Sequence, residues 1–145
     1  MKLSTRVRYG TKALLELARH WNKAPVPLKD IAQRQKIPLS YLEHLIRPLV
    51  RGGIVKSVRG SRGGITLLKP PENIILSEVI PLLESSLSPA KYIDRAHNTP
   101  RCVTQELWDE VKEAINKVYE SITLQDLADR QSRRTNVDTN ITAEV

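Results

Sequence analysis

A glycine-rich, doubly cationic stretch between two strand-like segments constrains the fold of this chain more than any other feature. The stretch is SVRGSRGG, residues 57–64, and it holds Gly60, Gly63 and Gly64, three of the six glycines in the sequence. IVKSV and GITLL flank it, and both runs are rich in β-branched residues, which predicts a β-hairpin with the glycines at its tip. A phosphate-binding loop would need a helix directly after its glycines, so a nucleotide site is disfavoured.

Three amphipathic segments precede the hairpin. Residues 4–21 begin with Ser4 as a candidate N-cap and repeat apolar residues mostly at helical spacing. Residues 28–35 follow the proline-marked connector NKAPVPL and predict a short second helix. The segment KIPLSYLEHLIRPLVRGG, residues 36–53, carries Leu42, Leu45, Ile46 and Leu49 at i, i+3, i+4 and i+7, which predicts a third helix.

The third segment also carries signals for its end. Gly52 and Gly53 are typical of a helix C-terminus, and Pro48 inside the pattern should kink or tighten the last turn. Short helix, turn, second helix and hairpin are the element order of a winged helix-turn-helix. In that fold the second helix of the pair enters the major groove, and the hairpin wing reaches the backbone or the adjacent minor groove.

The charge of the chain is divided between its two halves. Residues 1–69 contain fifteen lysines and arginines against three acidic residues, a net charge of +12, whereas residues 70–145 contain eight against thirteen, a net charge of −5. A basic half attracts polyanions and gains from counterion release, so double-stranded DNA is the favoured partner. The alternative is an ordinary solvated cationic surface.

Several classes of protein are disfavoured by composition. The sequence has no run of about 18 apolar residues, and its N-terminus MKLSTRVRYG is polar, so we expect neither a membrane span nor secretion. Cys102 is the only cysteine, which excludes an intramolecular disulfide and fits a cytoplasmic protein.

A family resemblance covers about residues 1–128. The stretch LSYLEHLIRPLVRGGIVKSVRGSRGGITLLKPPENIILSEVI resembles the IscR, NsrR and CymR type of bacterial transcription regulators, the Rrf2 family, and so do MKLSTRVRYGTKALLELA and RCVTQELWDEV. The resemblance implies a mainly α fold with a small β-hairpin wing. It also implies a homodimeric transcription regulator, for example a repressor, that binds a palindromic operator and is not an enzyme. Residues 1–76 would form the DNA-binding domain, residues 77–128 the effector loop and dimerisation helices, and residues 129–145 a polar tail.

The resemblance also implies which residues contact DNA. The start of the recognition helix and the wing tip would supply Ser40, Tyr41, Glu43, His44, Arg47, Arg59, Gly60, Ser61 and Arg62. A carboxylate facing DNA is useful chiefly as an acceptor from a cytosine amino group, which suits Glu43. Alternatives remain open: Ser40 as an N-cap, Tyr41 as a packed ring, Glu43 in a salt bridge with His44, Arg47 or another nearby cation, and Arg59 as a solvated charge.

A stripe of apolar residues in the second half predicts a long helix that needs a partner surface. After a short helix beginning near Ser77, the segment TQELWDEVKEAINKVYESI repeats apolar residues at helical spacing, and a second copy of the chain is the expected partner. The stripe is Leu107, Trp108, Val111, Ala114, Ile115, Val118 and Ile122. From about Asp129 the sequence is polar and unpatterned, and we expect a mobile or locally attached tail.

An expected iron–sulfur site is incomplete. Cluster-binding members of the family use three cysteines about six residues apart, whereas SSLSPAKYIDRAHNTPRCVT offers Cys102 alone, with Ala96 and Ala90 at the other two positions. His97 and Asp94 are thin substitutes for thiolate ligands. We therefore predict no cofactor and leave the effector unassigned.

Four alternative functions of the protein stay open. They are an iron–sulfur sensor and a thiol redox sensor, both built on Cys102, a winged-helix module that binds proteins, and an enzyme using Cys102 and His97. The enzyme lacks a third group to orient its base, and the protein-binding module would be expected to shed the charge that this wing retains.

The sequence generates a prediction about iron. Protein prepared anaerobically with iron and sulfide should be colourless and hold well under one iron per chain, because one thiolate does not hold a cluster. If Cys102 senses oxidants instead, mild peroxide should change DNA affinity, and Cys102→Ser should abolish that response while basal binding stays intact. Stoichiometric iron and sulfide, with visible absorption that disappears in Cys102→Ser, would contradict the first expectation.

Overall fold

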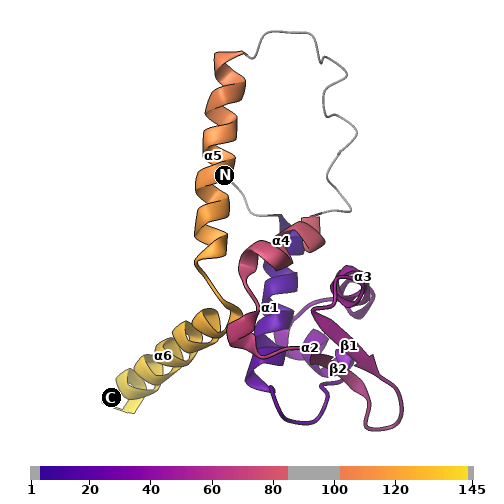
Figure 1. Cartoon of the computed structure of the whole chain (residues 1–145). Coiled ribbons are helices and arrows are strands. Elements are labelled where there is room, and N and C mark those ends of the chain that lie inside the picture. The colour runs from indigo at the N-terminus through magenta and orange to yellow at the C-terminus, as the bar shows by residue number, and fades with distance from the viewer. Residues whose placement is uncertain (1–3, 85–101, 144–145) are drawn as a thin grey trace.

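The computed structural model describes residues 4–84 and 102–143, with side chains to residue 138 (Figure 1). Its elements form a winged helix-turn-helix body, followed by two further helices. In chain order they are α1 (Thr5–Arg19), α2 (Leu28–Gln35), α3 (Leu39–Arg51), β1 (Val55–Val58), β2 (Gly64–Leu67), the 3-10 turn η1 (Pro71–Asn73), α4 (Leu76–Glu84), α5 (Val103–Glu120) and α6 (Leu124–Ala143). The predicted fold class, mainly α with a two-stranded hairpin, is confirmed.

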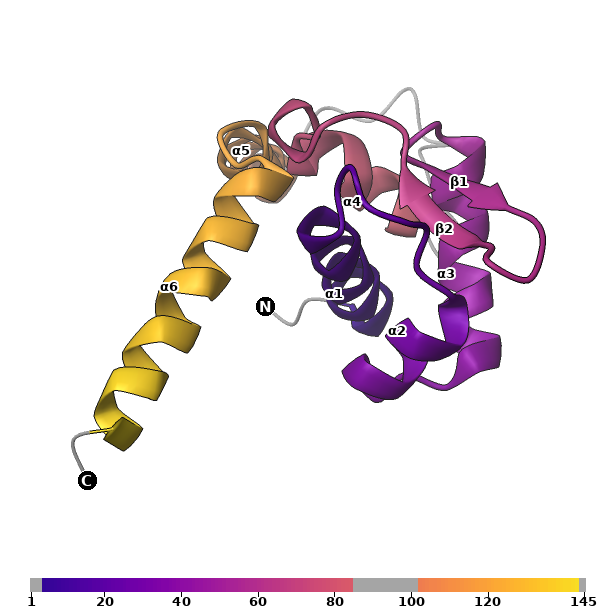
Figure 2. The same cartoon turned by 90° about the horizontal axis from the view of Figure 1, so that it is seen from below.

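Helix α1 is the centre of the body. Ser4 caps it as predicted, because its hydroxyl accepts a hydrogen bond from the backbone N–H of Val7 at 3.2 Å. Figure 2 shows α1 between α6 on one side and the α2–α3 pair on the other, and α1 contacts α2, α3, α4 and α6. The core is made of fully buried aliphatic side chains that include Leu14, Leu17, Ile31, Leu42, Leu45 and Leu49.

The turn between α2 and α3 is short and tightly bonded. Lys36 adopts a left-handed conformation with φ 54°, and the N–H of the buried Ile37 donates to the carbonyl of Ala32 at 2.9 Å. Helix α3 then begins after Pro38, so Ser40 lies inside the first turn and the N-cap alternative for Ser40 is wrong. Pro48 stays within α3, which ends at the predicted glycines.

The wing is an antiparallel hairpin whose register pairs Val55 with Leu67 and Val58 with Gly64. A third segment joins it, because Val26 and Ile65 exchange two backbone hydrogen bonds of 2.9 Å. A Cβ on Gly64 would overlap the backbone of Val26, so the close approach requires glycine there. Gly60 has φ 114° at the tip, a conformation that L side chains rarely adopt.

Helices α5 and α6 differ in how they are packed. Helix α5 buries no residue of its own and extends away from the body (Figure 1). The junction between the two helices is fixed to the start of α4, since Leu76 donates its N–H to Ile122 at 3.0 Å and Leu124 donates to Ile74 at 2.8 Å. None of the described helices is long and apolar enough to cross a membrane.

The expected mobile tail from Asp129 is wrong, because α6 continues as a helix to Ala143 and packs against α1. Thr123 and Asp126 form a reciprocal cap in which each backbone N–H donates to the other side chain, at 2.9 and 3.1 Å. The buried Leu124 and Ala128 then dock the first turns of the helix. The cap is visible in the sequence as TLQD. It begins helix α6, which continues past residue 129.

Glu16 is the only charged side chain buried among the described residues, with 5% of its surface exposed. One carboxylate oxygen accepts from Arg34 at 2.6 Å and the other from Gln35 at 3.1 Å, which ties the end of α2 to α1. Burial alone would raise the pKa of Glu16, but the hydrogen bonds from Arg34 and Gln35 and the charges of Arg34 and His20 outweigh it. The pKa therefore lies below its ordinary value of 4.5.

This ion pair predicts a pH-dependent stability. A carboxyl whose pKa is depressed on folding stabilises the folded state above its unfolded pKa, near 4.5, and the contribution is lost as the pH falls through the lower, folded pKa. Glu16→Gln should lower the free energy of unfolding by about 1–3 kcal/mol at neutral pH, measured by urea denaturation. The difference from the parent protein should shrink in acid.

Glu78→Gln is the matched control for this measurement. Glu78 pairs with Lys69 at 2.8 Å, but 44% of the Glu78 side chain and 35% of the Lys69 side chain are exposed, so the loss of this pair should cost less than about 0.5 kcal/mol. Equal losses for the two variants would contradict the role assigned to the buried carboxylate.

Candidate nucleic-acid interface

The first turns of α3 present a polar surface to solvent. Ser40, Glu43, His44 and Arg47 are all exposed, and their spacing of three and four residues places them on one side of the helix. The opposite side of α3 carries Leu42, Leu45, Ile46 and Leu49 into the core. The structure therefore brings four of the five predicted recognition-helix residues together on one solvent-facing strip.

Tyr41 is placed differently from the other four. Its ring is half-buried against the core and meets the ring of Tyr9 edge to face, with the centroids 5.9 Å apart and the planes at 84°. Lys12 lies over the Tyr9 ring, with its Nζ 5.6 Å from the centroid. This packing agrees with the alternative in which Tyr41 is a packed, partly buried ring.

Glu43 lies on the side of the recognition helix α3 that faces the strands of the wing. It lines one groove of about 450 Å³ with Arg47, Arg51 and Ser57, and a second of about 270 Å³ with Lys29 and the strand residues around Gly64. Within the described ranges, Glu43 forms no ion pair, so the salt-bridge alternative is not realised there. Its carboxylate is an exposed acceptor beside several exposed cations.

The wing tip is fully exposed. Arg59, Gly60, Ser61 and Arg62 all face solvent, and the Gly63 N–H closes the loop by donating to the Gly60 carbonyl at 3.0 Å. Sequence reasoning missed Lys29, Arg51 and Ser57, which the fold places around Glu43. The i, i+4 spacing of Arg47 and Arg51 was the available signal for one of them.

The predicted dimerisation stripe lies along α5, except for Ile122, which follows the helix and packs against the core. Val103, Leu107 and Trp108 expose 78%, 54% and 61% of their surfaces, and Val118 is also exposed, whereas Val111, Ile115 and Ile122 are half-buried. A groove of about 520 Å³ runs along this helix beside Cys102, Trp108 and Ile115. So much exposed apolar surface on one helix is typical of an interaction face.

Cys102 is exposed at the N-cap of α5, and the hydroxyl of Thr104 donates to its Sγ at 3.1 Å. This side-chain hydrogen bond, followed by one from the Thr104 backbone N–H, lowers the pKa of the thiol. His97 lies outside the described residues, so its relation to Cys102 stays a prediction.

The available donors do not fit an iron–sulfur cluster. Such clusters are held mainly by cysteine thiolates, and Cys102 is the single thiol of the sequence. Among residues 4–84 and 102–138, no three histidine, cysteine or carboxylate side chains form a group that could hold a metal. The described residues therefore contain one thiolate that could bind iron, that of Cys102, and no second one.

Comparisons with known proteins agree with this architecture. The family described as "Rrf2: Iron-dependent Transcriptional regulator" matches residues 3–130. The chain is 39% identical to the HTH-type transcriptional regulator CymR of Bacillus subtilis (strain 168), over 88% of this chain and 90% of that protein. It is 41% identical to Protein rrf2 of Nitratidesulfovibrio vulgaris, over 88% and 87%. The solved structure "T. potens IscR" superposes with a TM-score of 0.77 at 40% identity, covering 90% of this chain and 88% of that one.

Two substitutions separate base reading from phosphate contact. Arg59→Ala should weaken binding to operator and scrambled duplexes alike, because a wing arginine senses phosphate and groove width. Glu43→Ala should cost about 1–3 kcal/mol on the operator and relax its preference at one base pair, while affinity for scrambled DNA stays equal or rises. Parallel titrations on both duplexes measure the two effects, and equal losses on both duplexes for Glu43→Ala would count against base reading.

Proposed function

The chain belongs to the Rrf2 family of DNA-binding transcriptional regulators, and from this membership we propose that it reads a palindromic operator as a homodimer. Each α3 would enter the major groove, and each wing would contact the minor groove or the backbone. As a regulator of bacterial DNA it would act in the cytoplasm, without catalysing a reaction. The observation that carries this proposal is the exposed Glu43 on α3, which forms no ion pair within the described residues and is bordered by the cations Lys29, Arg47 and Arg51.

The chemistry of this face suits DNA. Lys29, Arg47 and Arg51 surround Glu43 and would hold phosphates, which fix the position of α3 without reading sequence. A carboxylate within that cationic frame is repelled by phosphates, and it gains a favourable contact only where a cytosine amino group meets it. Glu43 would thus supply discrimination, while its neighbours would supply affinity.

The homodimer is supported by the uncovered face of α5. Trp108 and Leu107 are more than half exposed, although such side chains are normally buried in a stable protein. A two-fold axis would let the same stripe on each copy cover the other, and it would place two recognition helices on symmetric half-sites. A palindromic operator follows from that symmetry.

Regulation in this proposal does not pass through an iron–sulfur cluster, because the donor set offers one thiolate. A second candidate is a thiol-based sensor, which the exposed Cys102 and its hydrogen bond from Thr104 favour. The more acidic thiol would ionise more readily and react with peroxide to a sulfenic acid. The two candidates are distinguished by measuring DNA affinity with and without peroxide. A response in the parent protein that is lost in Cys102→Ser favours the thiol-based sensor.

Selection of bound fragments from a genomic library should return a palindrome, and Trp108→Asp tests the dimer that would read it. The variant should be monomeric by sedimentation, because a charge within the apolar stripe opposes burial. Its operator affinity should fall about a hundredfold or more, since two linked half-sites are lost. Glu113→Gln, at an exposed pair with Lys117 outside the stripe, is the control and should remain dimeric. A Trp108→Asp monomer with parental affinity would refute the proposal.

A further inference from the structure

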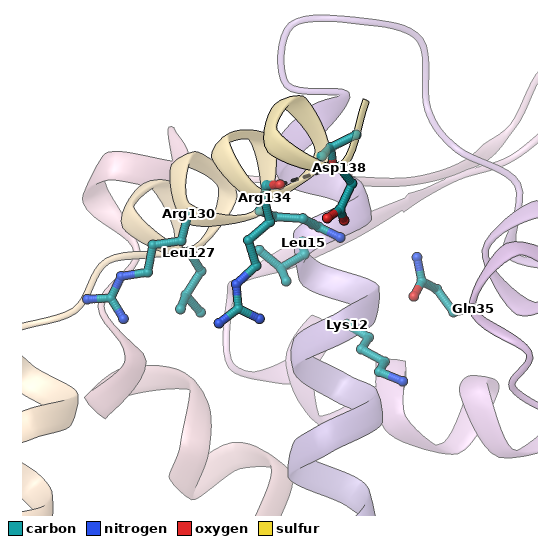
Figure 3. Close-up of a pocket in the computed structure, with 9 residues that line it drawn as sticks. Lys12, Leu15, Gln35, Leu127, Arg130, Arg134 and Asp138 are labelled. Atoms are coloured by element: carbon teal, nitrogen blue, oxygen red, sulfur yellow. Dashed lines mark hydrogen bonds between the residues drawn. The ribbon is translucent and has the colours of Figure 1, made fainter. Parts of the chain in front are cut away.

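A pocket of about 570 Å³ lies between α1, the end of α2 and α6, away from the proposed DNA face (Figure 3). Its walls come from three elements, with Lys12 and Leu15 on α1, Gln35 on α2, and Leu127, Gln131 and Arg134 on α6. Its volume falls within the range typical of small-molecule sites, and it exists because α6 is a docked helix.

The lining of this pocket selects a kind of ligand. Lys12, Arg130 and Arg134 contribute three positive charges against one carboxylate, that of Asp138, so the pocket favours an anion. Figure 3 shows Arg134 reaching from α6 toward α1, while Leu15 and Leu127 lie between the two helices. Both leucines are half-buried and would contact the carbon skeleton of a small organic molecule.

A buried acceptor adds a second requirement. The Oε1 atom of Gln131 is shielded from solvent and has no hydrogen-bond partner among the described residues. A buried acceptor without a donor costs free energy, and because Gln131 lines the pocket, a rotation of its side chain would turn Oε1 toward a ligand that brings a hydroxyl or an amine. The pocket therefore pairs cations with an acceptor that needs a donor.

We propose that this pocket binds a small organic anion, a carboxylate or a phosphate, that also carries a hydroxyl or amine, and that this ligand is an effector of DNA binding. Arg134 holds the anionic group, the charge of Lys12 adds to the attraction, and the hydroxyl or amine donates to Gln131. Only the effector role rests on the function proposed above, since binding itself needs no DNA.

The route to the DNA face runs through Gln35. Its side chain lines the pocket and also donates to the Glu16 carboxylate at 3.1 Å, next to the Arg34–Glu16 pair. These contacts set how α2 sits on α1, and α3 follows α2 after a short turn. A ligand that draws Gln35 toward itself therefore shifts the support of the recognition helix.

Calorimetric titration of the full chain with three probes tests the site. L-malate carries carboxylates and a hydroxyl, glycerol 3-phosphate carries a phosphate and hydroxyls, and succinate is L-malate without its hydroxyl. L-malate or glycerol 3-phosphate should bind saturably at millimolar concentration, and the tighter of the two identifies the anionic group. If L-malate is the ligand, succinate should bind about threefold to tenfold more weakly, because Gln131 stays unsatisfied. Failure of both hydroxylated probes would overturn the proposal.

Two arginines on the same helix provide matched variants. Arg134→Ala should weaken binding about tenfold or more, because a charged hydrogen bond to the anion is lost. Arg133→Ala removes the same charge outside the pocket, where Arg133 donates to the Asp129 carbonyl, and should leave binding within about twofold. Equal losses would mean diffuse attraction to a basic helix and would overturn the site. Gln131→Met should abolish the preference for L-malate over succinate.

Operator affinity measured with and without the bound probe tests the effector role. The probe should change that affinity by about threefold or more in the parent protein, and Gln35→Ala should bind the probe while losing the change. Binding without any effect on operator affinity would overturn the effector role. If the chain failed to bind any duplex, the proposed function would fail, while the calorimetric titration would still decide the site.

Discussion

The buried carboxylate of Glu16 is the interaction on which the geometry of the DNA-facing half depends. It joins α1 to the last turn of α2 through Arg34 and Gln35, and the turn at Lys36 leads directly into α3. A charge with 5% exposure is tolerated only when its oxygens are hydrogen-bonded. The angle between α1 and α2 is thereby fixed by directional hydrogen bonds. The less directional packing of the aliphatic core, which includes Ile31 of α2 and Leu42 of α3, adds to them.

Helix α1 carries this constraint to the rest of the molecule. One side meets α2 and α3, another receives α4, where the Leu83 side chain packs closely on Gly10, and a third receives α6. Because a single helix touches the elements of both halves, a change of packing on α6 has a short physical path to α2. A regulator needs such a path between the site that senses and the site that binds.

The two halves of the chain differ in their surfaces: the first half is strongly basic, and the second exposes apolar side chains. The first 69 residues hold a net charge of +12, and the fold places Lys29, Arg47 and Arg51 in the grooves that Glu43 lines. The second half is acidic overall and instead exposes the apolar stripe of α5. In the proposed homodimer, self-association through α5 would cover this stripe and join two basic domains in one molecule.

Local patterns in the sequence determined the helices, the hairpin and the exposed stripe, because the periods of 3.6 and 2 residues, the Ser4 cap and the glycines at 60, 63 and 64 act over a few neighbours. The residues of the strip from Ser40 to Arg47 came instead from the family resemblance, and the helical period accounts only for their lying on one side of α3. The helix of the supposed tail was also encoded locally, in the Thr123–Asp126 cap, and was overlooked because the following residues are polar.

Only the tertiary structure decided the pairing of Glu16 with Arg34, the packing of Tyr41 on Tyr9, the placement of Lys29 beside Glu43, and the pocket around Gln131. The physical reason is that each of these contacts joins different elements, and their meeting depends on how whole helices pack, which no local period records.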